Sequence, residues 1–152
     1  MSPSAVSTRP AALEILAQTE FFSGLDRAQL EKLAAVSTLQ EHAQGVEIYN
    51  HGQPARYLYV LAEGLVQFAI GLRNRTSGGD MLRRGNVFGW AALTPGVRQR
   101  IATATCVTPC TVLAIDGNRC FALMEADHAM GFLVMTRLNL MITSTLTAFV
   151  AG

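Results

Sequence analysis

The sequence contains very little lysine, histidine, cysteine and tryptophan. Lys32 is the only lysine among 12 basic residues, and the formal net charge is +1. A charge so close to zero gives no reason to expect that the whole molecule binds DNA or RNA. The three histidines form no H-x-H pattern, and no G-x-S-x-G sequence occurs. Because the usual metal-binding and hydrolase signatures are missing, we expect no enzyme activity, no metal and no cofactor.

The cysteines are too few and too irregular for a disulfide framework. Cys106, Cys110 and Cys120 are odd in number, so at least one thiol stays unpaired, and no C-x-x-C occurs. Free buried thiols in a reducing cytoplasm are the expected state. Cys106 and Cys110 flank a predicted turn, and a redox pair is the alternative interpretation of their spacing.

Segments that direct a protein to a membrane are also missing. The first ten residues have no apolar stretch of the secretory kind, and we expect residues 1–10 to form a flexible arm. Residues 131–152 are strongly apolar, but Arg137 and Asn139 lie near their middle. An arginine at the centre of a bilayer costs roughly 2.5–3.5 kcal/mol. We therefore predict a buried helix and no membrane contact.

The 152 residues are enough for one domain with a proper core, to which we assign residues 11–152. Half of the residues are hydrophobic and 15% are charged, as in a folded globule. Helical periodicity occurs at both ends of this domain. The predicted helices are 11–18, 26–37 with Asp26 and Gln29 as a capping box, a short helix capped by Asp116 or Asn118, and 127–148 capped by Asp127.

Between the helices the sequence consists of short β-like runs separated by turn residues. The predicted strands are 39–42, 46–49, 56–62, 65–72, 81–82, 87–89, 101–107 and 111–115. We expect the last two to form a hairpin around Thr108-Pro109. Many short strands at close spacing predict a small antiparallel β-jelly roll, and the flanking helices make the fold class α+β.

The last predicted helix has apolar residues over about half of its circumference, which is wider than one core contact needs. They fall on two stripes: Phe132, Met135, Ile142, Leu146 and Phe149, and Val134, Leu138, Met141 and Ala148. We expect one stripe to pack on the roll and the other to form a homodimer. The alternative is that the second stripe covers the chain's own N-terminal helices.

The stretch 85–103 predicts an anion site. Gly89 ends a short strand in a tight turn, residues 90–93 are long enough for one helical turn, and Pro95-Gly96 stops it. The amides at the start of such a turn lack partners, and Arg100 returns towards them on the next strand. The region 64–115 is also basic, with six arginines against one acid: Arg73, Arg75, Arg83, Arg84, Arg98 and Arg100 against Asp80.

These segments together match a known family. The quoted motifs are F-F-S-G-L-D-R-A-Q-L-E-K-L from Phe21, G-V-E-I-Y-N-H-G-Q-P-A from Gly45, L-Y-V-L-A-E-G from Leu58, G-N-V-F-G from Gly85 and R-I-A-T from Arg100. Over roughly residues 21–147 the chain resembles the cyclic nucleotide-binding domain of the catabolite activator protein and of protein kinase A regulatory subunits. Five glycines stand at the turns of that family: Gly45, Gly52, Gly64, Gly85 and Gly89.

The resemblance implies a regulatory module that senses a cyclic nucleotide, such as cyclic AMP or cyclic GMP, or a related phosphate-bearing ligand. The implied ligand-binding residues are Phe88, Gly89, Trp90, Ala91, Arg100, Ile101 and Ala102, with Arg100 on the phosphate. Trp90 stands where the family has a glutamate that accepts from the ribose 2′-OH, and an indole N–H cannot accept. The alternative is therefore a degenerate module that binds no nucleotide and acts in dimerisation or protein contact. Because the chain ends at Gly152, we expect no helix-turn-helix and no direct DNA binding.

Overall fold

The computed structural model describes residues 5–70, 81–97 and 99–151. Its helices are α1 Ala5–Gln18, η1 Glu20–Phe22, α2 Arg27–Ala35, η2 Trp90–Leu93, α3 Gly117–Ala126 and α4 His128–Ala151. Its strands are β1 Ser37–His42, β2 Glu47–Tyr49, β3 Tyr57–Glu63, β4 Val66–Ile70, β5 Met81–Leu82, β6 Val87–Phe88, β7 Ala102–Cys106 and β8 Cys110–Asp116.

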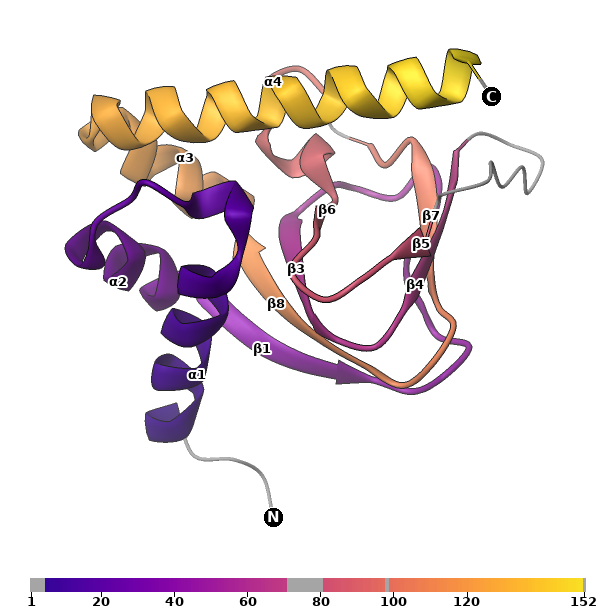
Figure 1. Cartoon of the computed structure of the whole chain (residues 1–152), viewed down its shortest axis with the longest axis horizontal. Coiled ribbons are helices and arrows are strands. Elements are labelled where there is room, and N and C mark those ends of the chain that lie inside the picture. The colour runs from indigo at the N-terminus through magenta and orange to yellow at the C-terminus, as the bar shows by residue number, and fades with distance from the viewer. Residues whose placement is uncertain (1–4, 71–80, 98, 152) are drawn as a thin grey trace.

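The eight strands form two antiparallel sheets, in the orders β1-β8-β3-β6 and β2-β7-β4-β5. Figure 1 shows the roll with α1 and α2 beside β1 and β8, and α4 running across the top. The predicted jelly roll with flanking helices is thus confirmed.

The central strands β3 and β8 are buried on both faces, and their alternating side chains divide the core in two. Leu58 and Val60 of β3 pack against the helices, together with Leu113 of β8. Tyr59 and Leu61 point instead into the roll between the sheets. One strand therefore fixes the position of the helical layer and of the roll interior at the same time.

The predicted hairpin of the last two strands is wrong. β7 pairs with β2 and β4, whereas β8 pairs with β1 and β3 in the other sheet. The chain changes sheet at Thr108-Pro109, and this connection packs against the turn at Gly64. A Cβ on Gly64 would lie 2.5 Å from the Pro109 carbonyl oxygen, so only glycine fits there.

The helix caps follow the sequence predictions. Asp26 and Gln29 form a capping box on α2, and the Asp116 carboxylate accepts from the Arg119 amide at the start of α3. Asp127 Oδ1 accepts from the Met130 amide, 3.1 Å away, at the start of α4. α1 begins at Ala5, inside the stretch expected to be an arm, and residues 1–4 lie outside the described residues.

The long helix α4 has a buried face and an exposed apolar face. Met130, Val134 and Leu138 are buried against the helical core. Phe132 and Leu140 are 77% and 58% exposed. The side chains of Leu146, Ala148 and Phe149 lie outside the described part of the chain. Within the described ranges, no helix combines the length and apolarity that crossing a bilayer requires.

Candidate anion-binding site

The site begins where β6 ends. Val87 and Phe88 pair with Val60 and Tyr59 of β3, which fixes the end of β6 against the centre of the roll. Gly89 then adopts φ +79°, a left-handed conformation that glycine takes without steric cost, and turns the chain into η2. The amides at the N-terminus of η2, at Trp90 and Ala91, fall outside the helix's own hydrogen-bond pattern.

Arg100 lies just before β7 and is almost completely buried, at 3% exposure. Its Nη1 donates to the Gly89 carbonyl oxygen at 2.8 Å, and its Nη2 donates to the Tyr57 carbonyl oxygen at 2.6 Å. The guanidinium carbon stands 4.2 Å from the centre of the Tyr49 ring and 5.7 Å from that of Tyr59. Nε has no hydrogen-bond partner among the described residues.

The electrostatics of this arrangement are unusual because no carboxylate neutralises the buried cation. Among the described residues the ion pairs are Arg27–Glu31 and Arg56–Asp116, and neither involves Arg100. Burial lowers the pKa of Arg100, and the two tyrosines act in the opposite direction. Burial raises the pKa of both Tyr49 and Tyr59, so they remain neutral phenols at neutral pH. Two carbonyl dipoles and an aromatic face are thus the main protein groups that stabilise the Arg100 charge.

The structure brings six of the seven predicted site residues around one small cavity: Gly89, Trp90, Ala91, Arg100, Ile101 and Ala102. Phe88 does not line this cavity; its ring stacks on Tyr59 at 5.2 Å, inside the roll. The free volume is about 10 Å³, close to the minimum for one water molecule. The space beside Arg100 is therefore too small for a nucleotide.

The cavity is completed by two aromatic residues that the sequence analysis did not assign to it. They are Tyr49, from β2, and Phe68, from β4. Tyr59 and the Tyr57 carbonyl, both from β3, hold Arg100 from the same side. For β3 the sequence did contain a signal: Tyr57 and Tyr59 are two residues apart, and alternate residues of a strand share one face.

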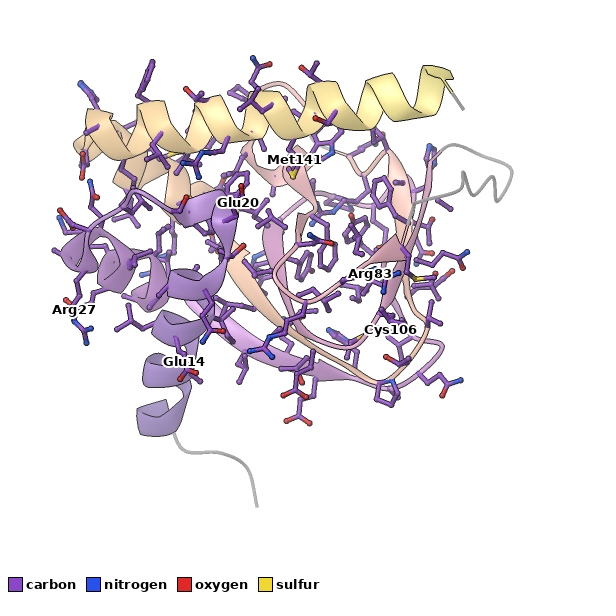
Figure 2. All side chains as sticks on the ribbon, in the orientation of Figure 1. Glu14, Glu20, Arg27, Arg83, Cys106 and Met141 are labelled. Atoms are coloured by element: carbon purple, nitrogen blue, oxygen red, sulfur yellow. The ribbon has the colours of Figure 1, made fainter. Side chains whose placement is uncertain are left out.

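Of the wider basic region, the two described arginines, Arg83 and Arg84, do not line the cavity. Arg83 and Arg84 are exposed, and Arg84 donates to Gln18 of α1. Figure 2 shows Arg83 at the edge of the roll, away from α4. Arg73, Arg75, Arg98 and Asp80 lie outside the described residues. In the described ranges, no group of three or more His, Cys, Asp or Glu side chains is placed to hold a metal ion.

A family model described as "Cyclic nucleotide-binding domain" matches residues 39–127, more than half of the chain. The chain belongs to this family. The match spans the roll from β1 to the end of α3, and it contains Gly89, Arg100 and the rest of the cavity. Domains of this family are typically regulatory.

Several solved structures share this fold. A proposed cyclic nucleotide-binding protein from Geobacter metallireducens GS-15 is 24% identical, with a TM-score of 0.77, over 89% of this chain and 98% of that one. The sensor domain of the transcriptional regulator DNR from Pseudomonas aeruginosa is 18% identical, with a TM-score of 0.74, over 91% and 93%. The regulatory domain of Toxoplasma gondii PKA with cAMP is 18% identical, with a TM-score of 0.74, over 94% and 51%. No curated protein matches the chain.

Proposed function

We propose that this protein is a regulatory module that binds a phosphate-bearing ligand, with Arg100 as the anchor for the anionic group. Before the ligand binds, the Arg100 guanidinium is held by the protein's own carbonyl oxygens, and the cavity walls have to move to admit a nucleotide. A cyclic nucleotide, as in the PKA domain solved with cAMP, is the first candidate. The proposed contacts are the six predicted residues that line the cavity, with Tyr49 and Phe68 added.

One observation carries this proposal: among the described residues, the buried Arg100 has no partner for its Nε–H and no carboxylate in an ion pair with it. Buried charges are normally paired, because an unpaired ion loses several kcal/mol of hydration. Carbonyl oxygens offer only partial charges in return. An incoming phosphate would supply the missing anion and accept from the guanidinium in a bidentate fashion.

Calorimetry with cyclic AMP, cyclic GMP, cyclic dinucleotides and inorganic phosphate tests the proposal. Arg100→Ala should abolish binding, because losing one partner of a buried charged contact costs roughly 2–5 kcal/mol. Arg100→Lys keeps the charge but loses the planar fork, and should bind with intermediate affinity. Arg56→Ala is the control, since Arg56 is exposed and pairs with Asp116 outside the cavity. Circular dichroism establishes that each variant is folded.

The second candidate function is a degenerate module that acts through protein contacts alone. The volume of about 10 Å³ beside Arg100 favours it, because no nucleotide fits without movement of the walls. Trp90 favours it too, since no acceptor for a ribose hydroxyl stands at that position. A flat calorimetric response to every nucleotide and to phosphate would support this candidate.

We further propose that the module is not catalytic, does not bind DNA directly and works as a cytoplasmic homodimer. Cys106, Cys110 and Cys120 are free buried thiols, which supports a reducing compartment. The exposed apolar residues Phe132 and Leu140 of α4 support a partner helix on that face. We also keep residues 11–152 as one domain that includes the dimerisation helix.

A further inference from the structure

A second, larger space lies next to the Arg100 cavity. It is a groove of about 520 Å³ between α4, η1 and the β5–β6 segment, and its volume is typical of small-molecule sites. Its apolar lining includes Phe21, Phe68, Met81, Leu82, Trp90 and Met141, and its polar side chains are those of Glu20, Asn86, Arg137 and Ser144. Figure 2 shows Met141 on the side of α4 that faces the roll. We call this space the α4 groove.

The α4 groove and the Arg100 cavity share two walls. Phe68 and Trp90 line both spaces, and both side chains are only half-buried. A rotation of the Trp90 side chain would therefore join the small cavity to the groove. The joined space would have a cation at its inner end and an apolar body.

The charges around the joined space are unequally distributed. Among the described residues, Arg100 is the only charged side chain that lines the small cavity. At the rim of the groove, Glu20 and Arg137 carry opposite charges. Arg137 is also bound through Nη1 to the carbonyl oxygens of Glu20 and Phe21 and to Ser23 Oγ. The rim thus contributes no net charge, and the joined space favours one anionic group at Arg100.

The small cavity is also poor in partners for hydroxyl groups. Among the described lining residues, the polar side-chain groups are the Arg100 guanidinium, the Tyr49 phenol and the Trp90 indole N–H. With so few acceptors beside Arg100, sugar hydroxyls buried in this cavity would lack partners, and each unpaired group costs affinity. An apolar body in their place would be stabilised by contact with Trp90, Phe68 and Met81.

We propose that the ligand of this site has a single anionic group, a phosphate or carboxylate that binds Arg100, and a flat apolar body that fills the α4 groove. This inference rests on the proposed function, because it uses the same arginine. It differs in the class of ligand, since it places no sugar in the site. Trp90 then forms the movable wall between the two halves.

Calorimetry with 1-naphthyl phosphate, 1-naphthoate, cyclic AMP and inorganic phosphate tests the ligand class. The naphthyl phosphate should bind at least about tenfold more tightly than cyclic AMP or phosphate, because only it fills the groove. Comparing 1-naphthoate with 1-naphthyl phosphate shows whether Arg100 binds a carboxylate or a phosphate more tightly. Emission of Trp90, the only tryptophan, should change on binding.

Two variants tie the binding to the two halves of the site. Arg100→Lys should weaken the naphthyl phosphate, and Met81→Gln should weaken it by roughly fourfold or more without affecting inorganic phosphate. Val107→Gln is the matched control, because Val107 lines neither space and is exposed. Unchanged affinity in both site variants would overturn the inference.

The outcomes separate this inference from the proposed function. Cyclic AMP binding as tightly as naphthyl phosphate would overturn the apolar ligand class and leave the function of Arg100 standing. A flat response to all four compounds, phosphate included, would overturn both.

Discussion

Gly89 is the residue on which the position of Arg100 depends. Its carbonyl oxygen accepts from Arg100 Nη1, and its φ of +79° aims that carbonyl. A Cβ there would lie 3.0 Å from Arg100 Nη1 and 3.1 Å from both the Tyr57 carbonyl oxygen and Tyr59 Cδ2. Conformation and crowding therefore both select glycine.

We expect Gly89→Ala to destabilise the protein through both effects. The left-handed φ costs an alanine about 1–2 kcal/mol, and the crowding adds about 1–3 kcal/mol. Gly96→Ala is the matched control, because Gly96 has φ +85° but open space around its Cα. Urea unfolding of both variants separates the two costs. Equal losses would show that crowding at Arg100 contributes nothing.

The site residues that could be predicted from the sequence are those that lie close together along the chain. Gly89, Trp90 and Ala91 were found because they are consecutive, and Arg100 because it follows at a family spacing. Tyr49 and Phe68 were missed because they reach the cavity from strands distant in sequence. Only pairing of β7 with β2 and β4 brings those two rings to the cavity, and pairing partners are not encoded by local periodicity.

At the scale of elements, the strands were predictable and one pairing was not. Alternating apolar residues and turn glycines marked all eight strands to within a few residues. Thr108-Pro109 marked a chain reversal correctly, but a reversal does not say which sheet the next strand joins. β8 joins β1 and β3 because its two apolar faces must both be covered, by the helices and by the roll interior.

The start of α4 depends on Asp127, which connects two helical elements. Its Oδ2 accepts from Gln29 Nε2 of α2 at 2.9 Å, while Oδ1 caps α4. The Gln29 hydrogen bond, followed by the Met130 amide, holds the pKa of Asp127 below its usual value of 3.8. A carboxylate with a lowered pKa stabilises the fold above its unfolded-state pKa, and this contribution is lost as pH falls through the folded-state value.

We expect Asp127→Ala to lower the urea midpoint at pH 7, because α4 loses its cap and its tie to α2. Asp127→Asn is the control, since asparagine caps well but carries no charge. The wild-type protein should be more stable than Asp127→Asn at pH 7 and lose that advantage below about pH 4. A pH-independent difference between these two proteins would contradict the role assigned to the charge.

For the whole molecule, the order of the layers could be predicted from the sequence, but which face of α4 is buried could not. Helical periodicity at both ends and strands between them predicted a roll with helices beside it. Both apolar stripes of α4 looked alike in sequence, and Val134 and Leu138 of one stripe are buried in the core. In the other stripe Met135 and Ile142 are half-buried against the same core, and Phe132 faces outwards. The direction in which α4 crosses the roll decides this, and it is set by α3 and η1, not by the helix itself.

The exposed face of α4 is where we expect a second copy to bind. Leu138 is unsuitable for testing this, because it packs in the chain's own core and its loss would unfold the protein. Phe132 is 77% exposed and lines neither the α4 groove nor the Arg100 cavity.

In a two-fold dimer each substitution acts twice, so Phe132→Asp should remove about 3–6 kcal/mol of association free energy. Sedimentation velocity should show a dimer for the wild-type protein and at least about 100-fold weaker association for the variant. Val46→Asp places the same charge on an exposed apolar residue at the start of β2, away from α4, and should remain dimeric. A wild-type monomer at high concentration, or equal dissociation of the two variants, would rule out α4 as the dimer interface.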